Sequence, residues 1–441
     1  MEEFIDYDAL SASLREFLPR QRWFGGKGEV IEHVALDHVE VMRDEWPCLL
    51  RLEADVRTES GAGDLYHVLV GVRPIGQPPT FLEENSDAGM GEFETRLGSG
   101  WAYDALRDGE LTLMLYRHVF PHLAPPERVR PMNAEASNSL LIFDDSVVFK
   151  IFRSLSDKVN LDLEVSEALG RVGFSQVAAP LGVWREHGVD LGMAQPFLSG
   201  GTDGWALALT SLRDMFGGGG DPALSGGDFA AEARRLGSTT AELHGALAEA
   251  FGVLPSDPKR WAEAMETQLA RTHHPELDAE AAERTFRRLA EIGDPGPSIR
   301  VHGDLHLGQA IRTDTGWFVL DFGGEPSRPV EERREFSSPL KDVAGILRSL
   351  HYATWTALAE QEEVKLRSLA RSWEERNRGA IVDGYMEAAQ RIGGLLPEDD
   401  SSFGLILKAF ELDRGVYEIG YEMDHRPEWI KVPLAAISRL Y

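Results

Sequence analysis

The sequence changes character near Gly200-Gly201, and this change limits the folds that the chain can adopt. Before the two glycines, short runs of Val, Leu, Ile and Phe are separated by turn residues, which is typical of β-strands. After them, apolar residues recur every three or four positions, as they do in amphipathic helices. We therefore predict an α+β protein with a β-rich N-terminal lobe, a mainly helical C-terminal lobe and a ligand-binding cleft at the connector.

The N-terminal half carries the clearest strand patterns. Strands are predicted over residues 30–41, 49–56 and 65–72. Residues 93–109 are predicted to be helical, and residues 111–116 to form a further strand.

A hairpin followed by a helix is predicted next along the chain. Two apolar runs, residues 140–143 and 147–152, are joined by an Asp-Asp-Ser turn. Asn160 then precedes a helical pattern, and Asn is a favoured N-cap residue.

The strongest chemical signal is the stretch His-Gly-Asp-Leu-His-Leu-Gly-Gln over residues 302–309. Asp304 and Gln309 are five positions apart, and Asp321 follows after a short hairpin-like segment. Phosphoryl transfer needs a carboxylate near the acceptor hydroxyl and oxygen ligands for Mg²⁺. Protein kinases use an Asp, an Asn five positions later and a further Asp after a strand. Gln309 offers the same amide oxygen on a longer side chain, so the segment predicts phosphoryl transfer.

A lysine that binds nucleotide phosphates is then expected in the N-terminal half, and Lys150 is the candidate. It lies in the apolar run of residues 147–152, where a buried lysine needs an anionic partner. Glu164 on the following helix is the natural partner, as in the Lys–Glu ion pair of kinases. Glu167, one helical turn further, is an alternative partner for Lys150. The alternative to a nucleotide-binding role is that Lys150 is an ordinary lysine on an exposed strand face.

Two shorter segments are weaker candidates for nucleotide contacts. Ser137 and Asn138 directly precede the first hairpin strand, where many kinases place glycines over the phosphates; a plain turn explains them equally well. Gln195 and Phe197 lie where the connector would contact adenine.

Taken together, these segments resemble the actinobacterial maltokinases, members of the aminoglycoside-phosphotransferase-like branch of the protein-kinase-like superfamily. The stretch of residues 302–309 alone indicates only the superfamily. The narrower resemblance rests on Arg-Trp-Phe-Gly-Gly-Lys at residues 22–27 and on Tyr-Glu pairs with Arg-Pro-Glu-Trp at residues 417–429.

The resemblance implies a bilobal kinase-like enzyme with an N-terminal cap subdomain over residues 1–88. A nucleotide-binding subdomain over residues 89–200 and a helical C-lobe over residues 201–441, with the catalytic loop and sugar site, complete the expected organisation. The implied reaction is ATP-dependent phosphorylation of maltose at its anomeric hydroxyl. Its product, maltose 1-phosphate, would feed α-glucan (glycogen) synthesis from trehalose, and trehalose synthase is a candidate partner.

The resemblance also assigns roles to individual residues. Asp304 would be the catalytic base, Gln309 and Asp321 would bind Mg²⁺, Lys150 would hold the ATP phosphates, and Asp342 would brace the catalytic loop by hydrogen bonding. Aromatic faces and bidentate polar groups suit a sugar, although helix packing is the favoured explanation for any single residue of the C-terminal group. The sugar-site candidates are His302, Tyr417, Glu418, Tyr421, Glu422, Arg426 and Trp429.

Three departures from the family pattern widen the choice of acceptor. Gly323 stands where a Glu is usual, Arg414-Gly415 replaces Lys-Ala, and Met-Asp-His at residues 423–425 replaces Ala-Arg-Asn. The last change makes the region more acidic, so an amino-sugar acceptor, glucosamine or an aminoglycoside, is an alternative substrate. A pseudokinase used as a binding module is a third alternative, which the set of catalytic residue types disfavours.

Composition excludes several other classes of function. The chain has 45 Lys and Arg against 73 Asp and Glu, a formal net charge of −28, which disfavours binding to nucleic acid or to an anionic membrane. Cys48 is the only cysteine, so an internal disulfide or a cysteine-rich zinc site is impossible. No signal-peptide pattern or apolar run of about 20 residues is present, so a cytoplasmic protein is expected.

Overall fold

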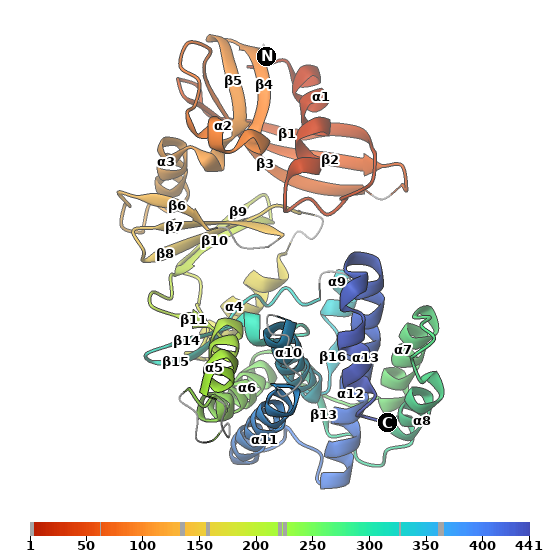
Figure 1. Cartoon of the computed structure of the whole chain (residues 1–441). Coiled ribbons are helices and arrows are strands. Elements are labelled where there is room, and N and C mark those ends of the chain that lie inside the picture. The colour runs from red at the N-terminus through yellow and green to blue at the C-terminus, as the bar shows by residue number, and fades with distance from the viewer. Residues whose placement is uncertain are drawn as a thin grey trace. The chain divides into compact units, whose positions relative to one another are not determined.

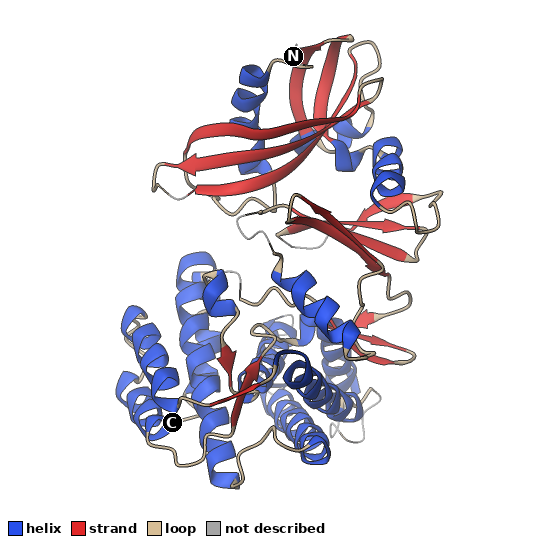
Figure 2. Cartoon of the chain, turned by 180° about the vertical axis from the view of Figure 1, so that it is seen from behind, coloured by secondary structure: helices blue, strands red, loops and turns tan. Residues whose placement is uncertain are grey.

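The computed structural model describes residues 4–61, 63–132, 137–155, 159–218, 223, 227–325, 328–359 and 366–441. The chain divides into two compact units (Figure 1). Unit 1 comprises Met1–Glu164 with Ala179–Ser199, and unit 2 comprises Val165–Ala178 with Gly200–Tyr441. Strands dominate unit 1 and helices dominate unit 2 (Figure 2), which confirms the predicted α+β class.

Unit 1 begins with an antiparallel five-stranded sheet of order β1-β2-β3-β5-β4. Its first three strands confirm the three strands predicted from sequence. Helix α1 (Tyr7–Phe17) packs on this sheet through Leu10, Leu14 and Phe17, which recur at helical spacing and are fully buried. The strands are β1 (Ile31–Arg43), β2 (Cys48–Thr58), β3 (Gly63–Pro74), β4 (Gly89–Thr95) and β5 (Gly98–Asp104).

Two predictions between residues 93 and 116 were wrong. The predicted helix of residues 93–109 is mostly β4 and β5. Both strands belong to the first sheet, although the cap subdomain was expected to end at residue 88. Gly98, with φ of 116°, lies at the turn between them, in a region of backbone space that favours glycine. The predicted strand of residues 111–116 lies in helix α3 (Gly109–Val119), because the Asp108 carboxylate caps its first turn by accepting from the N–H groups of Glu110 and Leu111.

A second antiparallel sheet, of order β6-β7-β8-β10-β9, completes unit 1. Helix α3 contributes Leu111 and Leu115 to a core shared by Leu69 of the first sheet and Phe149 of the second. The strands are β6 (Val129–Met132), β7 (Asn138–Phe143), β8 (Val147–Phe152), β9 (Gly182–Glu186) and β10 (Val189–Pro196), and the short helix α2 is Phe81–Glu84.

The predicted hairpin and the predicted helix start are both confirmed. Asp144 and Asp145, in the turn between β7 and β8, have φ of 48° and 50°, as a tight hairpin turn requires. Helix α4 (Leu161–Arg171) follows, and the Asn160 side chain caps it by accepting from the N–H groups of Asp162 and Leu163.

Unit 2 consists of helices and two small antiparallel sheets. The sheets have the orders β11-β14-β15 and β12-β13-β16, and the hairpin of β14 and β15 is the one predicted before Asp321. The helices are α5 (Gly204–Gly218), α6 (Ala230–Phe251), α7 (Pro258–Arg271), α8 (Ala279–Ala290), α9 (Val330–Arg333), α10 (Leu340–Ala359), α11 (Leu366–Ile392), α12 (Asp400–His425) and α13 (Lys431–Ile437). The strands are β11 (Thr202–Asp203), β12 (Val253–Pro255), β13 (Pro297–Arg300), β14 (Ala310–Thr313), β15 (Gly316–Val319) and β16 (Phe336–Ser337).

Among the described residues, every helix is too short or too polar to cross a bilayer.

Candidate active site

In unit 1, the ammonium group of Lys150 is buried and paired. Lys150 lies on β8, is 7% exposed, and donates to Asp162 Oδ2 over 2.7 Å. Asp162 lies in the first turn of α4, directly behind the Asn160 cap. Asp162 is thus a partner of Lys150 that the sequence reasoning, which named Glu164 or Glu167, did not consider. A contact of Lys150 with either glutamate stays a prediction. A buried lysine without such a partner would be costly.

The other nucleotide candidates of unit 1 lie on the same sheet. Lys150 pairs in register with Met193 of β10, and Gln195 is opposite Val148, two residues before Lys150. Asn138 is opposite Phe152, two residues after Lys150. Because directly opposite residues share a face and every second residue returns to it, Asn138, Lys150 and Gln195 lie on one face of the second sheet.

The remaining two candidates flank this face. Ser137 is exposed, and its Oγ accepts from Asn138 Nδ2 over 3.3 Å. Phe197 follows β10; its N–H donates to the Ser146 carbonyl over 2.8 Å, and the Arg130 guanidinium lies 5.6 Å from the centre of its ring. These contacts fix the backbone at the end of the sheet, where an adenine contact was predicted.

In unit 2, Asp342 braces the catalytic loop, as predicted. Its Oδ2 accepts from the His302 N–H over 2.7 Å and its Oδ1 accepts from the Gly303 N–H over 2.8 Å. His244 Nε2 lies 3.1 Å from Oδ2. Burial alone would raise the pKa of Asp342, but the hydrogen bonds and charge of its neighbours hold that pKa below the usual value.

Helix α10 reaches the loop closely because Gly345 has no side chain. A Cβ atom at this position would collide with the carbonyl oxygen of Leu305. The helix that carries Asp342 therefore lies directly against the backbone next to Asp304.

His302 is buried rather than open to a ligand. His302 is only 2% exposed. Its Nε2 lies 2.9 Å from the carbonyl oxygen of Leu320, and its ring packs against Phe322 with the ring centroids 5.0 Å apart. These contacts tie the catalytic loop to the segment that carries Asp321. The geometry therefore favours a bracing role over the predicted contact with a sugar.

Gln309 and Asp321 come together as the motif predicted. Gln309 Nε2 donates to Asp321 Oδ2 over 3.3 Å, and the Leu320 N–H donates to the Gln309 carbonyl over 2.9 Å. One carboxylate and one amide oxygen suit Mg²⁺, which binds few protein ligands and keeps waters or phosphate oxygens. Among the described residues, no cluster of three or more His, Cys, Asp or Glu side chains is arranged to hold a metal.

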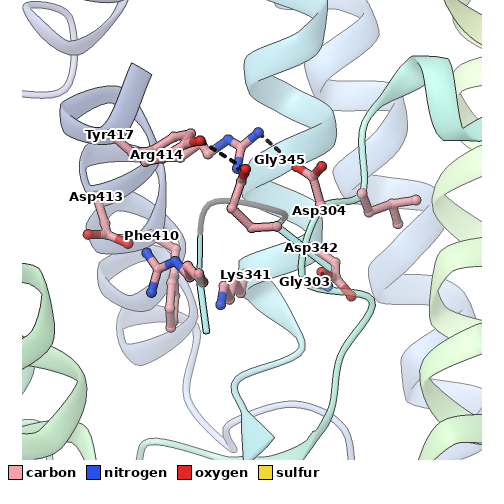
Figure 3. Close-up of a pocket in the computed structure, with 12 residues that line it drawn as sticks. Gly303, Asp304, Lys341, Asp342, Gly345, Phe410, Asp413, Arg414 and Tyr417 are labelled. Carbon is pink, nitrogen blue, oxygen red and sulfur yellow. Dashed lines mark hydrogen bonds and ion pairs between the residues drawn. The ribbon is translucent and has the colours of Figure 1, made fainter. Parts of the chain in front are cut away.

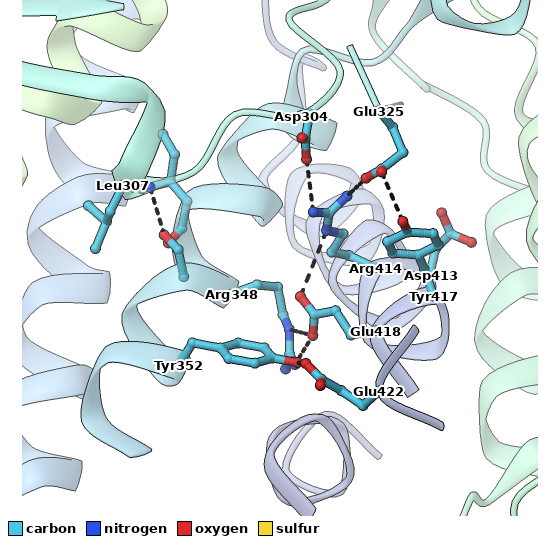
Figure 4. Close-up of polar contacts among 12 residues, drawn as sticks. Asp304, Leu307, Glu325, Arg348, Tyr352, Asp413, Arg414, Tyr417, Glu418 and Glu422 are labelled. Atoms are coloured by element: carbon cyan, nitrogen blue, oxygen red, sulfur yellow. Dashed lines mark hydrogen bonds and ion pairs between the residues drawn. The ribbon is translucent and has the colours of Figure 1, made fainter. Parts of the chain in front are cut away.

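Asp304 is held by an arginine from α12. Arg414 Nη2 donates to Asp304 Oδ1 over 2.8 Å, and its Nη1 donates to Glu325 Oε2 over 2.7 Å (Figure 4). Glu325 also accepts from the Tyr417 hydroxyl over 2.8 Å. Burial raises the pKa of Asp304 to about 6, against the lowering effect of Arg414 and with a further contribution from Glu325.

A small cavity of about 30 Å³ lies beside Asp304, with room for about one water molecule (Figure 3). A groove of about 1060 Å³ adjoins it and runs between α7, α12 and the segment before α10. The cavity and the groove share the lining residues Arg328, Lys341, Phe410, Asp413 and Tyr417.

The predicted C-terminal sugar residues separate into two groups. Tyr417 lines both hollows, and Tyr421 lines the groove with its ring stacked on His425 at 4.2 Å. Glu422 is buried, and it accepts from Arg426 Nη2 over 2.8 Å and from the Tyr352 hydroxyl over 3.1 Å.

The rest of this segment is occupied by internal contacts. The Arg426 guanidinium lies 5.6 Å from the Trp429 ring, and Glu418 pairs with Arg348. Helix packing therefore accounts for the contacts of Glu418, Glu422 and Arg426, and a sugar contact by any of them stays a prediction.

Sequence reasoning missed three functional candidates. Asp162 was overlooked because the orientation of α4 against β8 decides which acid contacts Lys150, and the sequence gives the start of the helix but not that orientation. Glu325 belongs to the Gly-Gly-Glu stretch that follows Asp321. The sequence therefore placed Glu325 close to Asp321 along the chain, but it did not predict the contact with Arg414. Arg414 was noted only as a departure from a family pattern, although it lies one helical turn before Glu418 and Tyr417 on the same helix.

Comparison with protein families gives two matches. Residues 17–108 match the maltokinase N-terminal cap domain, a stretch that runs from the end of α1 to just past β5. Residues 128–373, more than half of the chain, match the phosphotransferase enzyme family. This second region contains the second sheet of unit 1 and the catalytic loop of unit 2.

Individual relatives agree with these matches. A glucosamine kinase of Streptacidiphilus jiangxiensis is 28% identical over 288 residues, 62% of this chain and 64% of the relative. A glucosamine kinase of Mycolicibacterium smegmatis is 29% identical over 335 residues, 70% of this chain and 79% of the relative.

Solved structures show the same fold. A glucosamine kinase in complex with glucosamine, ADP and inorganic phosphate has a TM-score of 0.66 at 21% identity, covering 97% of this chain and 98% of that one. A second glucosamine kinase structure has a TM-score of 0.67 at 21% identity and covers 99% of both chains. The chain therefore belongs to the phosphotransferase enzyme family and carries a maltokinase N-terminal cap domain before its phosphotransferase region.

Proposed function

We propose that this phosphotransferase moves the γ-phosphoryl group of ATP to the anomeric hydroxyl of maltose. The observation that carries the proposal is the match of residues 17–108 to the maltokinase cap, ahead of a catalytic loop in which Asp304 is fixed and Gln309 lies beside Asp321. The products would be ADP and maltose 1-phosphate, a donor for building α-glucan. Because the reaction uses ATP, the proposed location of the protein is the cytoplasm.

In the proposed mechanism, Asp304 orients the acceptor hydroxyl and takes its proton as the oxygen attacks the γ-phosphorus. The bond between that phosphorus and the bridging oxygen breaks, and ADP leaves. A carboxyl with a pKa of about 6 is mostly ionised at neutral pH yet basic enough to accept a proton. Positioning supplies most of the rate, since the transition state of phosphoryl transfer is loose.

The nucleotide would be held by groups from unit 1. Lys150 would contact ATP phosphates, and Asp162 would keep its ammonium group in place. Asn138 and Gln195, on the same sheet face, would border the nucleotide. Mg²⁺ held by Gln309 and Asp321 would neutralise charge on the phosphate oxygens.

The volume of the groove and its aromatic lining support a disaccharide acceptor. Small-ligand sites commonly have volumes of about 300–1,000 Å³, and the groove beside the Asp304 cavity reaches the upper end of that range. Tyr417 and Tyr421 offer aromatic faces along it, which suit the apolar faces of sugar rings.

Glucosamine is the second candidate acceptor. Both relatives named above are glucosamine kinases, and carboxyl groups line the cavity and the groove. Asp413 lines both the cavity and the groove and Asp424 lines the groove, so an ammonium group on the acceptor would meet carboxyl groups there, beside the basic side chains of Arg328 and Lys341.

A coupled assay of ADP release distinguishes the two acceptors. Purified protein, ATP and Mg²⁺ are combined with maltose, glucose, glucosamine or kanamycin, each at the same range of concentrations. The proposal predicts the highest kcat/KM with maltose and a phosphate on C1 of the product, identified by ³¹P NMR. A higher kcat/KM with glucosamine would replace maltose by the second candidate, and release without any sugar dependence would reject both.

A further inference from the structure

Arg414 joins three carboxylates at the candidate active site. Its Nη2 contacts Asp304 over 2.8 Å, its Nη1 contacts Glu325 over 2.7 Å, and its Nε lies 3.8 Å from Glu418 Oε1. The guanidinium also lies 5.0 Å from the centre of the Tyr417 ring. All three of its nitrogen atoms therefore face an acid, and its plane is supported by an aromatic ring (Figure 4).

The support behind Arg414 is itself fixed. Arg348 on α10 donates from Nε to Glu418 Oε2 over 3.0 Å, and its Nη2 contacts the same oxygen. Arg348 and Glu418 are both buried. The position of the Arg414 guanidinium is thus set by α12, by α10 and by the segment after Asp321, rather than by its own flexible side chain.

This arrangement leaves one oxygen of Asp304 available. Arg414 binds Oδ1, whereas the described residues provide no hydrogen-bond donor to Oδ2. We propose that Arg414 is a positioning residue for the catalytic base: by binding Oδ1 and Glu325 together, it turns Oδ2 of Asp304 toward the acceptor hydroxyl. The proposal rests on the assignment of Asp304 as base in the proposed phosphoryl transfer, but not on the identity of the sugar.

The chemistry of the guanidinium explains why an arginine is needed. Its planar fork can bind two carboxylates at once with fixed directions, whereas a lysine ammonium acts as a point charge and fixes neither. Without the cation between them, Asp304 and Glu325 would repel each other, and the Asp304 carboxylate would lose the hydrogen bond that holds its present orientation.

Charge makes a second contribution. Arg414 favours the ionised form of Asp304, whose pKa burial raises to about 6. Removal of Arg414 should raise that pKa further, by roughly one unit or more, because an opposite charge within hydrogen-bond distance lowers a carboxyl pKa by about 1–3 units. The titratable and charged groups that face Asp304 across the loop and the cavity are Arg414, Glu325, His302, Arg328, Lys341, Asp342 and Asp413.

The test compares Arg414→Gln, Arg414→Lys and Arg378→Gln in the full chain. Arg378 is the matched control, since its side chain is 26% exposed against 28% for Arg414 and it pairs with Glu411 of the same helix α12. The readouts are kcat and KM from ADP release across pH 5–9, thermal unfolding, and a crystal structure of the unmodified protein and of Arg414→Gln.

We expect Arg414→Gln to lower kcat by roughly 100-fold, to change the acceptor KM by less than about threefold, and to move the acid limb of the kcat/KM profile to higher pH. Arg414→Lys should restore part of kcat, and Arg378→Gln should keep the pH profile. A loss confined to KM would show that Arg414 binds the acceptor instead. A kcat within about threefold of the unmodified protein would overturn the proposal.

The crystal structures keep this test independent of the sugar. The proposal predicts Arg414 Nη2 within hydrogen-bond distance of Asp304 in the unmodified protein and a rotated Asp304 carboxylate in Arg414→Gln. Separation of Arg414 and Asp304 in the unmodified protein would refute the positioning role of Arg414, whichever sugar is the substrate. Inactivity with both maltose and glucosamine would instead refute the proposed function and leave the positioning role standing.

Discussion

Replacement of Asp342 by Asn should loosen the catalytic loop. Asp342 is 1% exposed and accepts from two consecutive main-chain N–H groups, those of His302 and Gly303, and it also contacts His244. Asn has one acceptor oxygen, so only one of the two N–H groups keeps its bond. The other N–H then faces the amide NH₂ group, which is itself a donor.

The size of the effect follows from these contacts. A hydrogen bond to a charged group contributes about 1.5–3 kcal/mol, and the retained bond also weakens when the charge is removed. We therefore expect Asp342→Asn to lower the free energy of unfolding by roughly 2–4 kcal/mol. Because the freed loop carries Asp304, a shift of about 1 Å there should lower kcat by roughly 100-fold.

The pH dependence gives a sharper test of the same contacts. The pKa of Asp342 in the folded protein lies below its usual value. Such a carboxyl stabilises the folded state above its unfolded pKa, about 4, and this contribution disappears as the pH falls through the folded pKa. The difference in unfolding free energy between the two proteins should therefore be complete at pH 7 and should shrink below about pH 4.

Urea unfolding at pH 7, 5 and 3.5, followed by tryptophan fluorescence, measures this difference. Asp383→Asn is the control, because Asp383 is exposed on α11 and its contact with Arg234 is 3.4 Å long, a type of surface pair worth about 0–1 kcal/mol. A penalty below about 0.5 kcal/mol for Asp342→Asn, or one that stays constant from pH 7 to 3.5, would contradict the bracing role.

Three further predictions follow from the same geometry. Gly345→Ala should destabilise the protein by about 1–3 kcal/mol and lower kcat, because the added Cβ collides with the Leu305 carbonyl; thermal unfolding with parallel ADP-release assays measures both, and unchanged values would be evidence against the close packing. Asp162→Asn should raise the KM for ATP several-fold by removing the negative charge that helps to hold the Lys150 ammonium group in place, with little change in the KM for the sugar; equal changes in the two constants would argue against this role. The kcat/KM profile of the unmodified protein should have an acid limb near pH 6, set by Asp304, and a profile that is flat from pH 5 to 8 would exclude this carboxyl as the base.

Local signals in the sequence predicted local structure well. The Asp-Asp-Ser turn placed the β7–β8 hairpin, and Asn160 placed the start of α4, because each acts through contacts a few residues away. The spacing of Asp304, Gln309 and Asp321 also predicted that the last two would meet, since a single hairpin joins them.

Contacts between distant segments were beyond the sequence. Residues 111–116 form a short apolar run that is compatible with a strand or with a buried helix. The helix α3 is favoured by the Asp108 cap and by packing in the core between the two sheets of unit 1. Asp162 was missed because a shift of two residues along a helix changes which acid faces a strand. Arg414 and Asp304 are 110 residues apart, so their ion pair depends on how α12 packs against the loop.

The proposed mechanism depends most directly on Asp304 as the group that takes the acceptor proton. Single-turnover transfer from radiolabelled ATP to the sugar, measured for Asp304→Asn beside calorimetric binding of Mg-ATP, tests this assignment. We predict a loss of roughly 1,000-fold in the rate of transfer with a Kd for Mg-ATP within about threefold of the unmodified protein. Transfer within about tenfold of the normal rate would contradict the assignment, and with it the proposed mechanism.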